Sequence, residues 1–333
     1  MVTAPMARST WVAPLATLPP THLVVLVFGT LLGLMALFYS APIILLPGLF
    51  ALGLALVLGG SMLAGMIRGQ VFRPGGDWRL ARAHALGLVR GWFPFLALHW
   101  AYENMGGLTE LVQTEALDPA LAHADLALFG GHASLWMERV VQPWLTDLLG
   151  FVYALWLVVP AALLWYLHRK GKEKAFEEFR LAVLITCFAA FVGYTLFPAV
   201  GPRFVLAGEY SVPLSGAVFD LSSSLMQTLQ TATRDCVPSM HTALSTLWLI
   251  FVIRHRRELP ARWLAPVLAI LAVLIWYATI YLRQHWVVDV PIGWVHAAWS
   301  YGVADLLARW SSRRQELGWA PIWVEAQAGT SAR

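Results

Sequence analysis

Charged residues are scarce in this sequence. Asp, Glu, Lys and Arg make up 13% of its 333 residues, against about 25% in an average soluble domain. None of them occurs between Arg8 and Arg68. Because about 20 apolar residues are enough to cross a bilayer as a helix, the sequence excludes a soluble cytosolic enzyme and indicates an integral membrane protein.

Cysteine is also rare, and the spacings that give it a structural role are missing. Cys187 and Cys236 are the only two, and they form no CxxC pair, so no disulfide framework or zinc motif of that kind is predicted. The sequence has no HExxH motif and no basic run interleaved with aromatic residues. We therefore expect no cofactor, and we attribute the net charge of +4 to membrane topology rather than to nucleic-acid binding.

Eight apolar stretches predict an all-α, polytopic helix bundle. They cover residues 23–39, 43–67, 83–103, 148–168, 181–199, 240–253, 263–282 and 287–308. We expect the first to be a retained anchor rather than a cleaved signal peptide. In the 105–147 connection, apolar residues recur at helical spacing, which predicts helices that lie in the membrane interface.

The positions of Lys and Arg predict the orientation of this bundle. Short cytoplasmic loops carry an excess of basic residues. Such residues cluster at 68–82, 169–180, 254–262 and 309–314. In the 105–147 connection, by contrast, the charged residues are acidic except for Arg139. We therefore expect the basic segments and both termini to face the cytoplasm. This orientation brings three polar clusters to the outer face, at residues 201–204, 238–242 and 283–289.

The third cluster contains a histidine and an aspartate at helical spacing. His285 and Asp289 are four positions apart, which places them on one face of a helix. A carboxylate that accepts a hydrogen bond from one imidazole nitrogen leaves the lone pair of the other nitrogen facing outwards. The pair is thus predicted to be an activated nucleophile.

The other polar residues of the three clusters suit a phosphate group. His241 supplies a second imidazole to protonate a leaving oxygen, and Ser239 lies at a helix start, where backbone N–H groups attract anions. Arg203 and Arg283 add positive charge. We predict that His285, His241 and Asp289 are catalytic and that Arg203, Ser239 and Arg283 bind phosphate, with no metal in the site.

These motifs resemble those of a known family. Pro238-Ser239-Met240-His241 and the segment from His285 to Asp289 resemble the second and third signature motifs of the type-2 phosphatidic acid phosphatase superfamily. Phe197-Pro198, Gly201-Pro202-Arg203 and Tyr281-Leu282-Arg283-Gln284-His285 resemble its inositol-phosphorylceramide-synthase-like branch. Three family positions differ here: Leu196, Thr279 and Met240 stand where the family has Lys, Arg and Gly, so the phosphate site has fewer cations.

The resemblance implies both a fold and a reaction. It covers roughly residues 85–308 and implies a six-helix core with His285 as nucleophile, Asp289 orienting it and His241 as general acid. We therefore expect a lipid phosphatase or phosphotransferase of the bacterial inner membrane. It would act on a lipid phosphate at the extracytoplasmic face, with a slight preference for head-group transfer to an alcohol acceptor. The expected divisions are residues 1–82 with two extra helices, the catalytic core 83–310 and a disordered cytoplasmic tail 311–333.

Two other classes of protein remain open at this point. His285, Asp289 and His241 are also residue types that ligate zinc or iron, which would make the protein a metal-dependent membrane hydrolase. A transporter or scaffold that keeps the fold and uses the polar residues only for binding is the other alternative. Survival of activity after chelation, and its loss in His285→Ala, would separate these classes from a phosphohistidine enzyme.

Overall fold

The structure is a computed structural model that describes residues 18–230, 232–259 and 262–316. Within these residues the chain is helical, and its one β-type contact is an isolated parallel bridge between Ala199 and Asp235. The long helices are α2 (Pro20–Phe38), α3 (Gly48–Arg68), α4 (Trp78–Val112), α7 (Pro143–Arg169), α8 (Glu173–Leu196), α11 (Met240–Arg254), α12 (Leu264–Tyr281) and α13 (Asp289–Glu316). The shorter ones are α5 (Asp118–Phe129), α6 (Ala133–Trp136), the 3-10 helix η1 (Met137–Val140), α9 (Pro202–Val205) and α10 (Ala217–Leu229).

Each of the eight predicted spans is a helix in the structure, and the all-α membrane fold is confirmed. Five of the helices, α2, α3, α7, α8 and α12, are long and apolar enough to cross a membrane. Helix α11 is apolar but has 15 residues, which gives about 22 Å of helix against the roughly 30 Å of a bilayer core. Helices α4 and α13 are long, but they are less apolar than those five.

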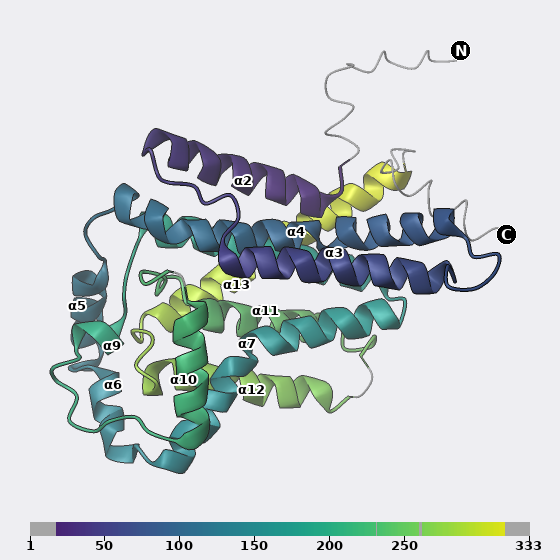
Figure 1. Cartoon of the computed structure of the whole chain (residues 1–333). Coiled ribbons are helices and arrows are strands. Elements are labelled where there is room, and N and C mark those ends of the chain that lie inside the picture. Colours follow the sequence, from purple (N-terminus) through teal and green to yellow (C-terminus); the bar gives the residue numbers. More distant parts are fainter. Residues whose placement is uncertain (1–17, 231, 260–261, 317–333) are drawn as a thin grey trace, which may run out of the picture.

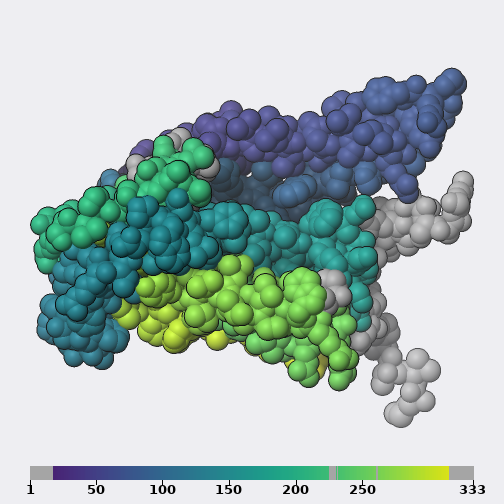
Figure 2. Space-filling view, turned by 90° about the horizontal axis from the view of Figure 1, so that it is seen from below, coloured from purple at the N-terminus to yellow at the C-terminus, as the bar shows by residue number. Residues whose placement is uncertain are grey.

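Helix α8 is the centre of the molecule, because most of its length is buried inside the protein. It packs against α2, α4, α7, α11 and α13, and its buried face includes Phe179, Phe188 and small residues such as Ala182 and Ala190. Helix α3 packs along α4, and α2 covers α4 and α8, so these two form an outer layer (Figure 1). In Figure 2 this N-terminal layer, drawn in purple and blue, lies along one side of the molecule.

The two ends of the bundle differ in composition. The connections between α3 and α4, α7 and α8, and α11 and α12 lie at one end (right in Figure 1), and these are the predicted basic segments. Short helices α5, α6, α9 and α10 lie at the other end. Helices α9 and α10 were not predicted, whereas the expected interfacial helices of the 105–147 connection correspond to α5, α6 and η1.

Two of the expected divisions reach residues that the structure does not describe. Helix α13 continues to Glu316, past the start of the tail expected at residue 311. Residues 317–333 of that tail, and residues 1–17 of the N-terminal region, lie outside the described residues.

Candidate active site

Backbone hydrogen bonds join the three polar clusters into one site. The Cys236 N–H donates to the Ala199 carbonyl at 3.1 Å, next to the bridge between Ala199 and Asp235. The Arg203 N–H donates to the Arg283 carbonyl at 2.8 Å. Segments that are far apart in the sequence are therefore neighbours at the end of the bundle that carries the short helices.

Gly201 allows the first and third clusters to approach this closely. Its φ is 86°, in the left-handed region, and a Cβ at this position would lie 2.5 Å from the Gln284 carbonyl oxygen. Such a distance is far inside van der Waals contact, and glycine is the residue that adopts this φ at little cost. The glycine of the Gly-Pro-Arg motif is thus explained by backbone packing.

His285 and Asp289 are in contact, as their spacing predicts. Nδ1 of His285 lies 3.4 Å from Oδ2 of Asp289, and the same oxygen accepts a 3.0 Å hydrogen bond from the Trp286 N–H. His285 lies in the turn before α13, whereas Asp289 is the first residue of that helix, so the two are not successive turns of one helix. Both side chains are buried, with 5% and 0% of their surface exposed.

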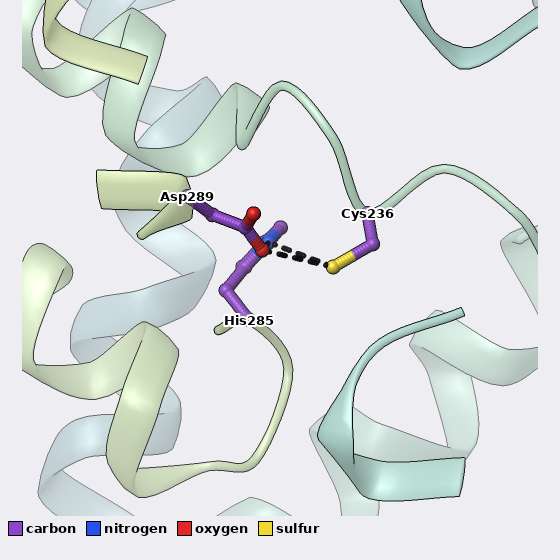
Figure 3. A group of neighbouring side chains, drawn as sticks. All are labelled: Cys236, His285 and Asp289. Atoms are coloured by element: carbon purple, nitrogen blue, oxygen red, sulfur yellow. Dashed lines mark hydrogen bonds and ion pairs between the residues drawn. The ribbon is translucent and has the colours of Figure 1, made fainter. Parts of the chain in front are cut away.

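A third side chain, Cys236, completes this group (Figure 3). Its Sγ lies 3.1 Å from Oδ2 of Asp289 and 3.4 Å from Nδ1 of His285. Burial, followed by the charge of Asp289, raises the pKa of the Cys236 thiol, so the sulfur is protonated. Cys236 was not predicted, because it forms no paired cysteine spacing, although it directly precedes the Val237-Pro238-Ser239 start of the second motif.

His241 lies at the N-terminus of α11 between two aromatic rings of α7. It stacks on Tyr153 with the ring centroids 3.8 Å apart, and it contacts Trp156 at 4.6 Å. The Tyr153 hydroxyl lies 3.1 Å from His241 Nδ1. Nε2 of His241 is buried and has no hydrogen-bond partner within the part of the chain that the structure describes.

The two imidazoles are neighbours. The ring centroids of His241 and His285 are 5.7 Å apart, with an angle of 58° between the ring planes. The structure therefore brings together the two histidines and the carboxylate that the sequence singles out.

The three predicted phosphate ligands differ in what they contact. Ser239 is buried and caps α11, because its Oγ accepts from the Thr242 N–H at 3.3 Å. The Arg283 guanidinium donates hydrogen bonds to the Val212 carbonyl at 2.5 Å and to the Glu138 carboxylate at 3.1 Å. The half-buried Arg203 guanidinium lies 4.5 Å from the Phe204 ring centroid, and it has no hydrogen-bond or ion-pair partner among the described residues. Arg203 is thus the cation that is available to a ligand.

Glu138 supports the Arg283 turn. Its carboxylate accepts hydrogen bonds from the Ser211 and Val212 N–H groups at 2.9–3.2 Å. Burial alone would raise the pKa of Glu138, but these bonds and the nearby Arg283 guanidinium outweigh burial and lower it. The carboxylate therefore stays charged, and Arg283 is held by contacts within the protein.

Two buried carboxylates of α5 hold the loops of the site. Asp118 accepts from the N–H groups of Val200 and Gly201, both at 2.8 Å, and from the Trp286 indole at 2.9 Å. Asp125 accepts from the N–H groups of Val287 and Val288 at 2.9 and 3.1 Å. Both side chains are 2% exposed. The sequence analysis interpreted the acidic residues of this connection only as a mark of the outer face.

Asp235 is another acidic residue beside the site that the sequence analysis did not identify. It accepts a 3.2 Å hydrogen bond from the Tyr102 hydroxyl and a 2.8 Å bond from the Gln230 amide. Burial raises the pKa of this carboxyl, and the nearby His285 opposes that effect. Its position next to Cys236 in the chain is the one sequence feature that points to it.

The structure groups potential metal ligands differently from the sequence expectation. Cys236, His285 and Asp289 each offer one donor atom, and these atoms lie within 4.8 Å of one another. His241, the third ligand in the alternative metal-dependent interpretation, instead has its Nδ1 beside Tyr153. The residues thus fit a metal only if the cysteine replaces the second histidine.

Comparison with known proteins gives one match. The model of a family described as the PAP2 superfamily matches residues 120–304, more than half of the chain. This range contains both histidines, Asp289, Cys236 and the α5 carboxylate Asp125. Searches of curated proteins and of solved structures found no match.

Proposed function

The chain belongs to the PAP2 superfamily, and we propose that it is a membrane phosphatase or phosphotransferase that acts on a lipid phosphoester through a phosphohistidine. The single observation that carries this proposal is the contact between His285 Nδ1 and Asp289 Oδ2, beside a second imidazole. A neutral His285 that donates its Nδ1 proton to Asp289 keeps the Nε2 lone pair free for phosphorus. This is the arrangement that a nitrogen nucleophile requires.

The first half of the proposed reaction transfers the phosphoryl group to the enzyme. Nε2 of His285 attacks phosphorus, an N–P bond forms and the bond from phosphorus to the leaving oxygen breaks. Burial favours the neutral form of His241 in the free site, so the proposal requires the bound anionic phosphoester to stabilise its protonated form. The protonated His241 then gives its Nε2 proton to that oxygen, which contributes about 10²–10⁴-fold by general acid catalysis. The buried, unpartnered Nε2 of His241 supports this role, because a substrate oxygen would be its first hydrogen-bond partner.

The second half returns the enzyme to its starting state. His241, now neutral, takes a proton from a hydroxyl whose oxygen attacks phosphorus, and the N–P bond breaks. Water as the acceptor makes the protein a phosphatase, and an alcohol makes it a phosphotransferase. We favour head-group transfer, in keeping with the inositol-phosphorylceramide-synthase-like motifs and with the burial of His285 and Asp289, since a dry site disfavours water.

Arg203 is our choice for the main phosphate ligand. Its guanidinium has no other charged partner among the residues described, and its N–H bond to the Arg283 carbonyl places it beside the third motif. Donors aimed at the phosphoryl oxygens stabilise the charge that gathers there in the transition state. Ser239 and the N-terminus of α11 are further candidates, and Arg283 would contribute mainly by holding the turn.

We further propose that the end of the bundle with the short helices faces the exterior of a bacterial inner membrane. The basic connections lie at the opposite end, and short basic loops stay in the cytoplasm. Both termini would then be cytoplasmic, with residues 83–310 as the six-helix catalytic core behind the two helices of residues 1–82. Cysteine-accessibility labelling at position 70 and at position 207 would test the orientation.

The decisive experiment is incubation of the purified protein with ³²P-labelled lipid phosphates, with and without an alcohol, followed by alkaline trapping of labelled protein. We expect an acid-labile, alkali-stable label in the wild type and none in His285→Asn. The exposed His123 of α5 gives the control His123→Asn, which should be labelled like the wild type. Label in His285→Asn would reject the proposed nucleophile.

Asp289→Asn tests the orienting role. The amide keeps the size of the side chain but no longer stabilises the Nδ1–H tautomer, so we expect turnover to fall by about 10²–10⁴-fold. The fold should persist, as measured by size-exclusion elution and thermal unfolding in detergent. A turnover within about twofold of wild type would refute the pair.

A further inference from the structure

The donor atoms of Cys236, His285 and Asp289 form a triangle of metal-site dimensions. The distances are 3.4 Å from sulfur to Nδ1, 3.4 Å from Nδ1 to Oδ2 and 3.1 Å from sulfur to Oδ2. Ligand atoms around a tetrahedral zinc ion, at about 2.0–2.1 Å for N and O and 2.3 Å for S, are about 3.3–3.6 Å apart. Shifts of a few tenths of an ångström would therefore turn this triangle into three corners of a zinc tetrahedron (Figure 3).

The electrostatics of the group also favour a cation. The Asp289 side chain is fully buried, and its Oδ1 has no hydrogen-bond partner within the described residues. No Lys or Arg of the described segments forms an ion pair with it, and its other oxygen faces only the thiol, the imidazole and the Trp286 N–H. A buried carboxylate with one oxygen unpaired and no cationic partner is stabilised by a nearby positive charge.

The donor types select the class of ion. Thiolate and imidazole are soft or borderline ligands that suit zinc, cobalt and cadmium, whereas magnesium and calcium require oxygen ligands. Three protein ligands leave the fourth position of a tetrahedral ion open for water. The group thus fits a divalent ion of the zinc type.

We propose that Cys236, His285 and Asp289 form an inhibitory binding site for a zinc-type cation. The inhibitory part rests on the function proposed above. Coordination uses the lone pair of Nδ1, so the Nδ1 proton moves to Nε2, and the thiol releases its proton to water. Nε2 then carries a hydrogen and has no lone pair with which to attack phosphorus, so the occupied enzyme cannot form the phosphohistidine.

Cobalt(II) is the probe for binding, because a thiolate ligand gives it a sulfur-to-metal charge-transfer band in the near ultraviolet. We expect this band when cobalt chloride is added to the full-length wild-type protein in detergent without lipid substrate. Cys236→Ser, which keeps a hydroxyl donor for Asp289, should lose the band. The matched control is Cys187→Ser on α8, the only other cysteine, which should keep it.

Activity is measured separately with zinc chloride. Zinc should inhibit the wild type and Cys187→Ser alike, and Cys236→Ser should need about tenfold more zinc or more for the same fractional inhibition. A chelator should restore the zinc-treated wild type. Loss of activity on chelation of untreated protein would overturn an inhibitory role, because it would make the metal a requirement.

The binding proposal has outcomes that do not depend on catalysis. Absence of the cobalt band in the wild type, or its persistence in Cys236→Ser, would overturn the site even if phosphohistidine is trapped. Conversely, a protein that binds cobalt through Cys236 but forms no phosphoenzyme would refute the proposed function and leave the site standing.

A second measurement covers the case in which Cys236→Ser does not fold. Zinc-loaded and zinc-free wild-type protein can be treated with a maleimide during mild unfolding and mapped by peptide mass. Zinc should protect Cys236 and leave the alkylation of Cys187 unchanged. Equal labelling of Cys236 with and without zinc would overturn the proposal.

Discussion

At the scale of single residues, the two histidines of the site have different partners. His285 faces the Asp289 carboxylate at 3.4 Å, whereas Nδ1 of His241 faces the Tyr153 hydroxyl at 3.1 Å. A carboxylate fixes one tautomer and stabilises the cation, but a hydroxyl can either donate to or accept from an imidazole nitrogen. His241 therefore keeps a hydrogen-bond partner in both protonation states, which suits a group that gives a proton and later recovers one.

Tyr153→Phe tests whether the Tyr153 hydroxyl supports His241 in proton transfer, because the substitution removes the hydroxyl and keeps the stacked ring. We expect kcat to fall by about 2–10-fold, the effect of one lost hydrogen bond worth 0.5–1.5 kcal/mol, while labelling of His285 persists. The comparison is Tyr166→Phe on the same helix, which lies near the other end of α7. Equal rates for the two variants and the wild type in steady-state assays would contradict the role of Tyr153.

The sequence predicted the residues that lie in recognisable motifs, and it missed those that join the site through long-range contacts. His285 and Asp289 are four positions apart, so their contact follows from local geometry. Cys236 and Tyr153 reach their histidines from segments far away in the chain. No local pattern encodes such contacts, because they depend on how α7 and α11 pack.

At the scale of elements, α5 holds the loops of the site through hydrogen bonds to two of its carboxylates, Asp118 and Asp125, which we call the α5 clamp. Asp118 holds the start of the Gly-Pro-Arg segment and the Trp286 indole, and Asp125 holds the two residues before α13. Each carboxylate accepts bonds from backbone N–H groups that a loop would otherwise leave unpaired inside the protein. The turn that carries His285 is therefore held by α5 as well as by its own helix α13.

Replacing Asp125 with asparagine should loosen this clamp. The amide offers one acceptor oxygen where the carboxylate offers two, and its NH₂ group faces a backbone donor. We expect a loss of about 1–3 kcal/mol in the free energy of unfolding and a 10- to 100-fold lower turnover as the turn moves. Both are measurable, by denaturant titration and by initial rates.

The exposed Glu115, which precedes α5 in the same connection, gives the control Glu115→Gln. This variant should match the wild type in both measurements. If Asp125→Asn also matched the wild type, the two hydrogen bonds would have no part in positioning His285.

The elements themselves were predicted to different degrees. Apolar stretches identified all eight long helices, although α4 and α13 are less apolar and α11 is shorter than the five helices that are long and apolar enough to cross a membrane. Helical spacing indicated α5 and α6, but neither α9 nor α10 was foreseen. Helix α10 depends on Asp147 of α7, which accepts from the Val218 and Phe219 N–H groups at 2.8 and 2.9 Å; this cap is distant in sequence.

At the scale of the whole molecule, the N-terminal layer is attached to α4 near both ends of that helix. The Ile44 and Leu45 backbone groups bond to Asn104 and Trp100 at 2.7–3.2 Å, near the site, and α3 packs along α4 toward the other end. A Cβ on Gly65 of α3 would lie 2.4 Å from the Ala81 carbonyl oxygen of α4, so the two helices touch through their backbones. The α3–α4 connection, which follows this part of α3, lies at the end of the bundle opposite the short helices. We therefore expect a mutation at this α3–α4 contact to leave the site unaffected.

Gly65→Val puts that expectation to the test. The added side chain must push α3 away from α4, which should lower the free energy of unfolding by about 1–3 kcal/mol and leave kcat within about twofold of wild type. Gly60→Val on the same helix is the control, since no atom lies within 4 Å of a Cβ there. A large loss of turnover in Gly65→Val would show that residues 1–82 and the core do not act separately.

The clamp has a consequence for how the protein is made. Asp118 and Asp125 are synthesised 162 to 168 residues before the segment they hold, from Trp286 to Val288, which directly precedes α13. These carboxylates remain without that segment until the chain has been synthesised past Val288. A chain whose synthesis stalls before His285 lacks both members of the pair, so under the proposed function such an incomplete product would be inactive.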